Sequence, residues 1–160
     1  MAISKDLAKK VVECLNGGVA FTPPTTYYFG LSTSLPVDDQ IPTGAEPPAS
    51  TGYKRVALPN TQLSGTSGTF TTANTTGDES TGLVASVTNA QTIEMDEITS
   101  GDEPEIKYFF LAETQQNSNE TGASKKVAMW GSFDRPRKLV INSNLIIEHG
   151  GAIFEVLNVI

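Results

Sequence analysis

The sequence predicts an all-β chain: an antiparallel β-sandwich, jelly-roll or immunoglobulin-like, preceded by one short N-terminal α-helix. Hydrophobic residues make up 38% and charged residues 18% of the 160 residues, and Thr, Ser, Asn and Gly are abundant, which favours short strands and many turns. Helical spacing of apolar residues is confined to the first eighteen residues, so the strands that follow are not separated by helices. The length suits one hydrophobic core, and we expect a single domain over residues 1–160.

The N-terminal helix, residues 1–18, is predicted by its ends and by one apolar face. Ser4 can cap the helix, Asp6 complements its positive end, and Gly17-Gly18 ends the pattern. The apolar residues recur three or four apart: Ile3, Leu7, Val11, Cys14 and Leu15. Two interpretations stand: the helix closes one end of the sandwich, or it docks onto a neighbouring subunit. On this face the cysteine is expected to be a small buried hydrophobe.

The first strand is predicted in the stretch PPTTYYFGLST, Pro23 to Thr33. Tyr27, Phe29 and Leu31 alternate with more polar residues, which places the three on one face of a strand. Gly30 lies on the other face, where it permits a bulge or the close approach of another chain segment or an aromatic ring. This strand therefore supplies aromatic area to a core that has little of it.

Two irregular segments flank a second strand. Residues 34–51 are rich in proline and lack periodicity, which indicates a loop. Alternation resumes in GYKRVAL, Gly52 to Leu58, and predicts the strand. Residues 59–82 are almost wholly Thr, Ser, Gly and Asn, which predicts an extended polar arm or loop.

The second half of the chain predicts seven more strands, separated by turn-forming residues. They are residues 83–89, 91–98, 105–113, 125–133, 137–142, 144–148 and 152–160. Several are apolar on both faces: Tyr108 and Phe110 alternate with Phe109 and Leu111. A sandwich strand needs only one buried face. We expect the other to be covered by the N-terminal helix, by the polar arm or by a second copy of the chain, and the last option suggests a homo-oligomer.

Charge and hydropathy exclude two classes of partner. A net charge of −7 disfavours nucleic acid, because binding phosphates requires a basic face. The chain holds no uncharged apolar run near the roughly 18 residues of a membrane span, and its N-terminus lacks the features of a secretory signal. We expect synthesis in a host cytoplasm and no membrane contact.

The sequence offers few residues for chemistry. One histidine, His149, excludes a multi-histidine metal site and is expected in a turn. Acidic pairs, of which Asp38-Asp39 is the first, lack the spacing of an EF-hand and are expected to be solvated turn residues. The basic run Arg135–Lys138 is expected to be a solvated strand entrance balanced by acids. We therefore expect no catalytic residue, no metal, no cofactor and no enzymatic activity.

The order of segments resembles a family of small virion proteins of tailed bacteriophages, often labelled tail fibre or minor structural proteins. The segments are AFTPPTTYYFGLSTS, GYKRVAL, VTNAQTIEMDEIT, VAMWGSF and PRKLVINSNLIIEHGGAIFEV. The residues that match the family pattern are Pro24, Thr26, Tyr28, Gly30 and Leu31, then Gly52, Tyr53 and Arg55, and finally Gly131-Ser132 and the segment Asn142 to Val156. The resemblance spans most of the chain. Residues 59–82 and 113–124 are longer than the family pattern implies.

The resemblance implies a virion structural protein of the tail or fibre that acts through protein–protein contacts and turns over no substrate. Its partners would be other virion proteins and identical copies. The candidate partner-contacting residues are Leu7, Val11, Leu15, Tyr28 and Trp130.

Three alternatives stay open. The chain could be a capsid decoration protein, or a glycosidase with two carboxylates in a groove. It could also be a receptor module that binds a host surface glycan, whose sugar would stack on tyrosines and the tryptophan: Tyr27, Tyr28, Tyr53 and Trp130.

Overall fold

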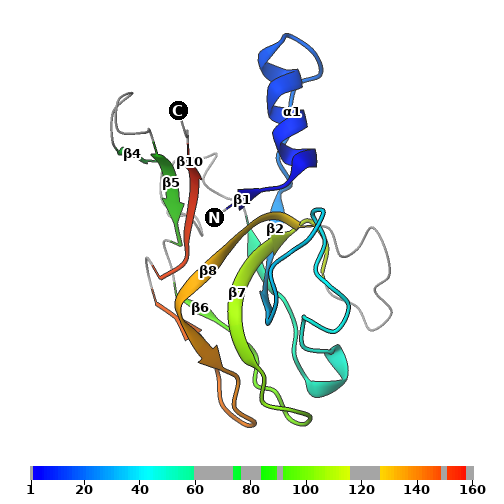
Figure 1. Cartoon of the computed structure of the whole chain (residues 1–160), viewed down its shortest axis with the longest axis vertical. Helices are drawn as coiled ribbons and strands as arrows, with labels where there is room; N and C mark the ends of the chain where they lie inside the picture. The colour runs from blue at the N-terminus through cyan, green and yellow to red at the C-terminus, as the bar shows by residue number, and fades with distance from the viewer. Residues whose placement is uncertain are drawn as a thin grey trace.

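The structure, a computed structural model, describes residues 2–59, 74–76, 84–89, 92–115, 127–148 and 151–157 (Figure 1). Within these ranges the chain forms antiparallel strands, one α-helix, α1 (Lys5–Leu15), and a short 3-10 helix, η1 (Ala49–Thr51). The predicted all-β class with a short N-terminal helix is therefore confirmed. The jelly-roll or immunoglobulin-like sandwich stays a prediction.

The described strands form three sheets, with antiparallel pairing throughout. The largest has the order β1 (Ala2–Ile3), β8 (Val127–Lys138), β7 (Glu105–Ala112), β2 (Thr26–Ser32), β3 (Val56–Pro59). A three-stranded sheet has the order β10 (Ile153–Leu157), β5 (Val84–Thr88), β4 (Asn74–Thr76), and a two-stranded sheet pairs β6 (Ile93–Glu94) with β9 (Ile146–Ile147).

The main core lies between one face of the five-stranded sheet and the segments around β6 and β9. The aromatic rings of Phe29 and Phe109, from β2 and β7, stack in it with centroids 5.8 Å apart. Its buried residues are Phe29, Leu31, Tyr53, Leu58, Ile93, Met95, Ile98, Ile106, Phe109, Leu111, Leu139, Ile147 and Ala152. The predicted inward face of β2, with Phe29 and Leu31, is confirmed.

A second cluster covers the opposite face of the same sheet. Phe110 and Ala112 of β7 and Val127 of β8 pack there against Ile41 and Ala45. We call this set the loop-covered cluster, since Ile41 and Ala45 belong to the proline-rich loop 34–51. The loop, which was not among the three covering elements expected, packs over this face of β7. A hydrogen bond from Thr33 N to Ala45 O, 2.9 Å, helps to hold the loop there. Covering by the rest of the polar arm lies outside the described residues, and covering by a second copy stays a prediction.

Gly30 lies directly opposite Phe110 in the pairing of β2 with β7. A methyl group at position 30 would overlap the Phe110 ring, so the predicted close approach of an aromatic ring is confirmed. The same arrangement recurs between Gly131 of β8 and Phe109, where an added Cβ would lie 2.6 Å from the ring. The two rings of β7 thus cover glycines on its two neighbouring strands.

Several predicted strands differ in extent. The two expected at 125–133 and 137–142 form one strand, β8, whose register with β7 is irregular: residues 133–136 lie opposite Lys107 alone. Pro136 lies in this stretch and has no N–H to donate. The strands expected at 91–98 and 144–148 pair only at β6 and β9, although Met95 and Ile98 are buried in the main core.

The strand expected at 52–58 pairs only from Val56 onward, because η1 and a left-handed Gly52 (φ 92°) precede it. Part of the predicted polar arm is regular, since Pro59 belongs to β3 and residues 74–76 form β4. The rest of the arm and His149 lie outside the described residues.

Candidate partner-binding surface

Helix α1 forms where the sequence predicts it. Ser4 is the N-cap, and its hydroxyl accepts a hydrogen bond from Leu7 N at 3.0 Å. Asp6 lies in the first turn, near the positive end of the helix. Gly17 follows the C-terminus with φ 74°, a left-handed conformation that glycine adopts at low cost. Local signals are therefore enough to explain both ends of α1.

The helix stands clear of the sheets and meets them only at its N-terminal end (Figure 1). None of its residues is buried, so the interpretation that it closes one end of a sandwich is wrong. Val11, Val12 and Leu15 are 39%, 54% and 80% exposed, and their spacing places them along one side of the helix. We call these three residues the apolar strip.

The exposure of Leu7 and Cys14 tests two other expectations for the apolar face of α1. Leu7, the first predicted contact residue, is half-buried near the base of the helix. Cys14 is an exposed free thiol, so the expectation of a buried cysteine is wrong. Because the helix does not pack against a sheet, its apolar residues remain accessible along most of its length.

The base of the helix is held by a tight turn in the loop 34–51. Asp38 and Asp39, with φ 50° and 61°, are the central residues of a two-residue hairpin closed by mutual hydrogen bonds between Val37 and Gln40. The carboxylate of Asp39 accepts Lys5 N at 2.8 Å, and that of Asp38 pairs with Lys5 Nζ at 2.9 Å. Both negative charges thus lie at the positive end of α1.

Backbone contacts complete this helix base. Ser4 N donates to Ala128 O at 2.8 Å, Val127 N donates to Asp39 O at 2.9 Å, and β1 pairs with β8 just before the helix begins. The hydrogen bond and charge of Lys5 lower the pKa of Asp38, and Asp38 raises the pKa of Lys5. Sequence reasoning placed Asp38-Asp39 among solvated turn residues and missed this role, because the partner is 33 or 34 positions away.

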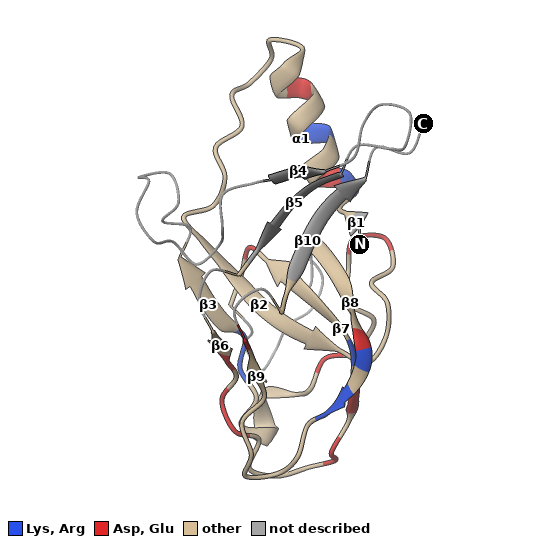
Figure 2. Cartoon of the chain, turned by 90° about the vertical axis from the view of Figure 1, so that its left-hand side faces the viewer, with Lys and Arg blue, Asp and Glu red and all other residues tan. Residues whose placement is uncertain are grey.

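The charges of α1 are paired within the chain. Lys9 pairs with Glu13 at 3.6 Å, and Lys10 pairs with Asp6 at 2.8 Å and with Glu113 at 3.6 Å. The acids raise the pKa of Lys10, the hydrogen bond from its ammonium to Asp6 being the main cause. Figure 2 shows basic and acidic residues side by side along the helix. The apolar strip therefore lies beside charges that are already balanced.

The other two predicted contact residues, Tyr28 and Trp130, lie on the five-stranded sheet. Both are half-buried, and the strand register places both on the face of the loop-covered cluster, against which Trp130 packs. The structure thus brings Tyr28 and Trp130 to one sheet face, and the remaining three candidates to the helix. Tyr53, proposed above as a sugar-stacking residue, is only 1% exposed, so that part of the glycan interpretation is wrong.

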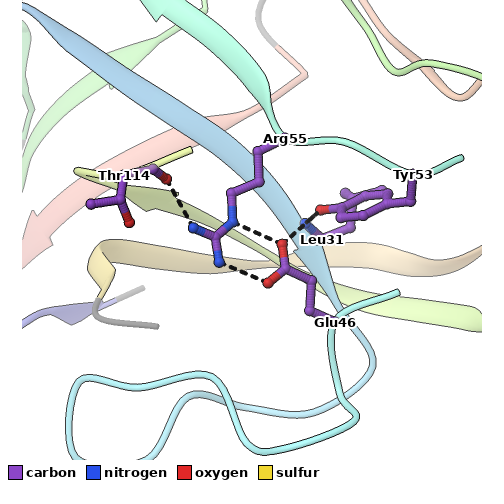
Figure 3. Close-up of polar contacts among 5 residues, drawn as sticks. All are labelled: Leu31, Glu46, Tyr53, Arg55 and Thr114. Carbon is purple, nitrogen blue, oxygen red and sulfur yellow. Dashed lines mark hydrogen bonds and ion pairs between the residues drawn. The ribbon is translucent and has the colours of Figure 1, made fainter. Parts of the chain in front are cut away.

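A buried ionic network joins the loop 34–51 to the sheet (Figure 3). Arg55 donates from Nε and Nη2 to the two carboxylate oxygens of Glu46, each at 2.8 Å, and from Nη1 to Thr114 O at 2.8 Å. The two charged side chains are 0% and 10% exposed. A bidentate pair with a further guanidinium donor bonded to a carbonyl is a form in which a buried charge is tolerated.

Tyr53 extends this network into β2. Its hydroxyl accepts Leu31 N at 2.8 Å and donates to Glu46 at 3.2 Å. Burial raises the pKa of Tyr53 well above its usual range, and the charge of Glu46 adds to the effect. The Arg55 guanidinium also lies 5.3 Å from the centroid of the Phe110 ring. These contacts fix the covering loop, and the two charged side chains have little exposure to solvent.

The basic run Arg135–Lys138 behaves as expected where pairs are described. Arg137 pairs with Asp134 at 3.3 Å, and Lys138 pairs with Glu103 at 2.7 Å. This pairing lowers the pKa of Glu103. Within the described ranges, no group of three or more His, Cys, Asp or Glu is placed to hold a metal ion. Nor does that part of the chain contain a helix long and apolar enough to cross a membrane.

Comparison with known protein families gives a match over most of the chain. The family model described as podophage GP4 fiber I protein gp80 matches residues 2–153. The matched region takes in the helix base, the apolar strip and both faces of the five-stranded sheet. A search of curated proteins found no match.

Proposed function

The chain belongs to the podophage GP4 fiber I protein family, and we propose that it enters the fibre through contacts made by helix α1. Membership confirms the predicted resemblance to phage tail-fibre proteins and makes the chain a virion component that associates with other virion proteins. The family favours a fibre position over the alternative of capsid decoration.

One observation carries the proposal: α1 is fixed at its base yet buries none of its residues. Val12 and Leu15, 54% and 80% exposed, are the kind of side chains that gain about 1.5–3 kcal/mol each on full burial. A helix held in one direction also loses little orientational freedom when a partner binds it. The apolar strip is therefore suited to a contact made during assembly.

We propose that the partner includes a second copy of the chain. The ion pairs of Lys9 and Lys10 balance the helix charges internally, so two strips can meet without bringing unpaired like charges together. The contact area of three side chains is small, and its strength would come from many copies held in one particle.

We also propose that the protein is not an enzyme. The Arg55–Glu46 pair is bidentate and almost wholly buried, and the exposed acidic pair at the helix base, Asp38-Asp39, is bound to Lys5. These acidic groups serve folding contacts in the described part of the chain. Hydrolysis of a saccharide by the purified protein would contradict this proposal.

The test is a double substitution, Val12→Ser with Leu15→Ser. The matched control is Leu35→Ser with Val140→Ser, at two exposed apolar positions outside the helix. Light scattering of the full chain over a range of concentration should show the mass of the parent and of the control rising above that of a monomer. The double variant Val12→Ser with Leu15→Ser should stay monomeric. At concentrations at which the parent is monomeric, the thermal unfolding of the two chains should match, because both side chains are exposed in the monomer.

Particles provide the second readout. Phage assembled with the helix double variant should contain at least tenfold less of the chain than phage assembled with the control, measured by mass spectrometry of purified virions. Normal incorporation of the helix double variant would overturn the role of α1. A parent chain that is monomeric at every concentration would overturn only the contact between copies.

A further inference from the structure

A cavity of about 710 Å³ lies beside β8, away from helix α1. It is lined by residues of β8, by β9 with its flanking residues, by Phe109 of β7 and by Gly151. A volume between about 300 and 1,000 Å³ is typical of small-molecule sites. Of the ion pairs described above, the pair between Asp134 and Arg137 lies at this cavity.

The cavity has an aromatic and aliphatic floor. Phe133 is half-buried and meets the ring of Phe109 edge to face, with centroids 5.1 Å apart and planes at 60°. Phe109 and Ile147 are 3% and 6% exposed, so they support the floor from beneath. Phe133 is therefore a fixed ring with part of its surface open to the cavity.

The rim of the cavity carries hydrogen-bonding groups of both kinds. Asp134 and Arg137 form an ion pair at 3.3 Å with side chains 75% and 49% exposed. Glu148 and Ser132 also line the cavity and are exposed. Within the described part of the chain, the carboxylate of Glu148 and the hydroxyl of Ser132 have no hydrogen-bond partner. The rim thus offers acceptors, a guanidinium donor and a hydroxyl group.

These groups narrow the chemistry of the ligand. An anion would meet two carboxylates and a guanidinium already paired with Asp134. An extended peptide would need a regular strand edge, but β8 is irregular over residues 133–136 and Pro136 has no N–H. A sugar fits both parts of the site: its hydroxyls donate to carboxylates and accept from a guanidinium, and its C–H face packs on an aromatic ring, whose π-face is electronegative.

We propose that this cavity is a saccharide-binding site, with Phe133 as the stacking surface and Asp134, Arg137 and Glu148 as the groups that bind hydroxyls. The site is distinct from helix α1, so the inference does not depend on the assembly role of the helix. It also differs from the tyrosine and tryptophan positions that the sequence suggested for a glycan.

The test is an NMR titration of the isotope-labelled full chain with a defined panel of sugars. The chemical shifts of the backbone amides report the binding. The panel holds glucose, galactose, mannose, rhamnose and N-acetylglucosamine, with their β-linked disaccharides. At least one probe should give saturable shifts at β8 and β9. Glu148→Gln and Asp134→Asn, which keep shape and remove charge, should each weaken that binding about tenfold. Phe133→Leu should weaken it further.

The matched control is Asp102→Asn, which removes an exposed carboxylate elsewhere and should bind the probe as the parent does. No saturable shift with any probe of the panel, or equal binding by the Glu148 and Phe133 variants, would overturn the inference. Saturable binding of an alternating Val-Thr hexapeptide at β8, in place of sugars, would also overturn it.

Variants of the helix and of the cavity distinguish the proposal that α1 acts in assembly from the proposal that the cavity binds a saccharide. The double variant Val12→Ser with Leu15→Ser should keep saccharide binding, and Glu148→Gln should keep the concentration-dependent mass of the parent. The same spectra show whether the disaccharide probes stay intact, as they should for a protein that binds without catalysis.

Discussion

At the residue scale, the fit between Gly30 and Phe110 leaves no room for a side chain at position 30. Gly30→Ala should lower the free energy of unfolding by about 1–3 kcal/mol, because the methyl group must displace a fully buried ring. Urea unfolding of the purified chain measures the change.

The matched control for this prediction is the same substitution in a chain that carries Phe110→Leu. The smaller side chain destabilises the protein by itself, but it removes the atoms that the added methyl group meets, so the two effects should not be additive. Equal penalties for Gly30→Ala in both backgrounds would show that the ring is not the cause.

Single residues also show which contacts can be predicted from the sequence and which cannot. The glycine in a strand between aromatic residues predicted a close approach at position 30, but the ring that fills the space, Phe110, depends on the pairing of β2 with β7. Likewise Tyr53 and Arg55 alternate as strand residues do, whereas their shared partner Glu46 lies in a loop without periodicity. Local pattern predicts the type of contact, and only the tertiary fold selects the partner.

At the scale of the element, the stability of α1 depends on its N-cap. Ser4→Ala removes the hydroxyl that accepts Leu7 N and should cost about 1 kcal/mol of helix stability. Hydrogen exchange of the amides in the first turn should then become about fivefold faster. Ser143→Ala, at an exposed position in a turn, is the control and should leave this exchange unchanged. Equal protection in both variants would contradict the capping role.

The helix illustrates which part of an element a sequence predicts. Its ends follow from Ser4 and Gly17, which act locally. Its direction follows from the turn at Asp38 and Asp39, whose backbone lies in the left-handed region and whose carboxylates hold Lys5. That turn is distant in sequence, so the pattern of apolar residues predicted a buried face where the structure has an exposed one. β8 shows the same limit, since Pro136 suggested a break that the sheet accommodates as an irregularity.

At the scale of the whole molecule, stability should fall as the pH rises above about 10, the ordinary pKa of tyrosine. Burial raises the pKa of Tyr53 in the folded state, so above pH 10 the unfolded state ionises first and is favoured. This contribution is fully present below the unfolded pKa and is lost as the pH rises through the folded one. Lys5 and Lys10, whose pKa values are also raised, act in the same direction.

The comparison of Tyr53→Phe with the parent isolates the contribution of Tyr53 to this pH dependence of stability. The variant loses the hydrogen bonds to Leu31 and Glu46, so it should be less stable near neutral pH, but its stability should fall less steeply above pH 10. Urea unfolding at several pH values measures both effects. Parallel curves for the two chains would contradict the role of Tyr53.

Function was predictable to the level of the family and no further. The order of strand and turn segments, from Pro24 to Leu31 onward, identified a phage fibre protein, and the match over residues 2–153 confirms it. The cavity beside β8 was not predictable, because Phe133 and Glu148 come from segments that meet only through the packing of β9 against the main core. Surfaces that join distant segments leave no periodic signal in the chain.

The two glycine–aromatic pairs constrain the order in which this sequence can evolve. Neighbouring residues of β7, Phe109 and Phe110, each cover a glycine on a different flanking strand, Gly131 and Gly30. A side chain at position 30 becomes acceptable only after the ring at 110 has been lost, yet losing the ring first opens a void in the loop-covered cluster. Each single step passes through a less stable protein, so the members of each pair are expected to change together across a lineage or to stay as they are.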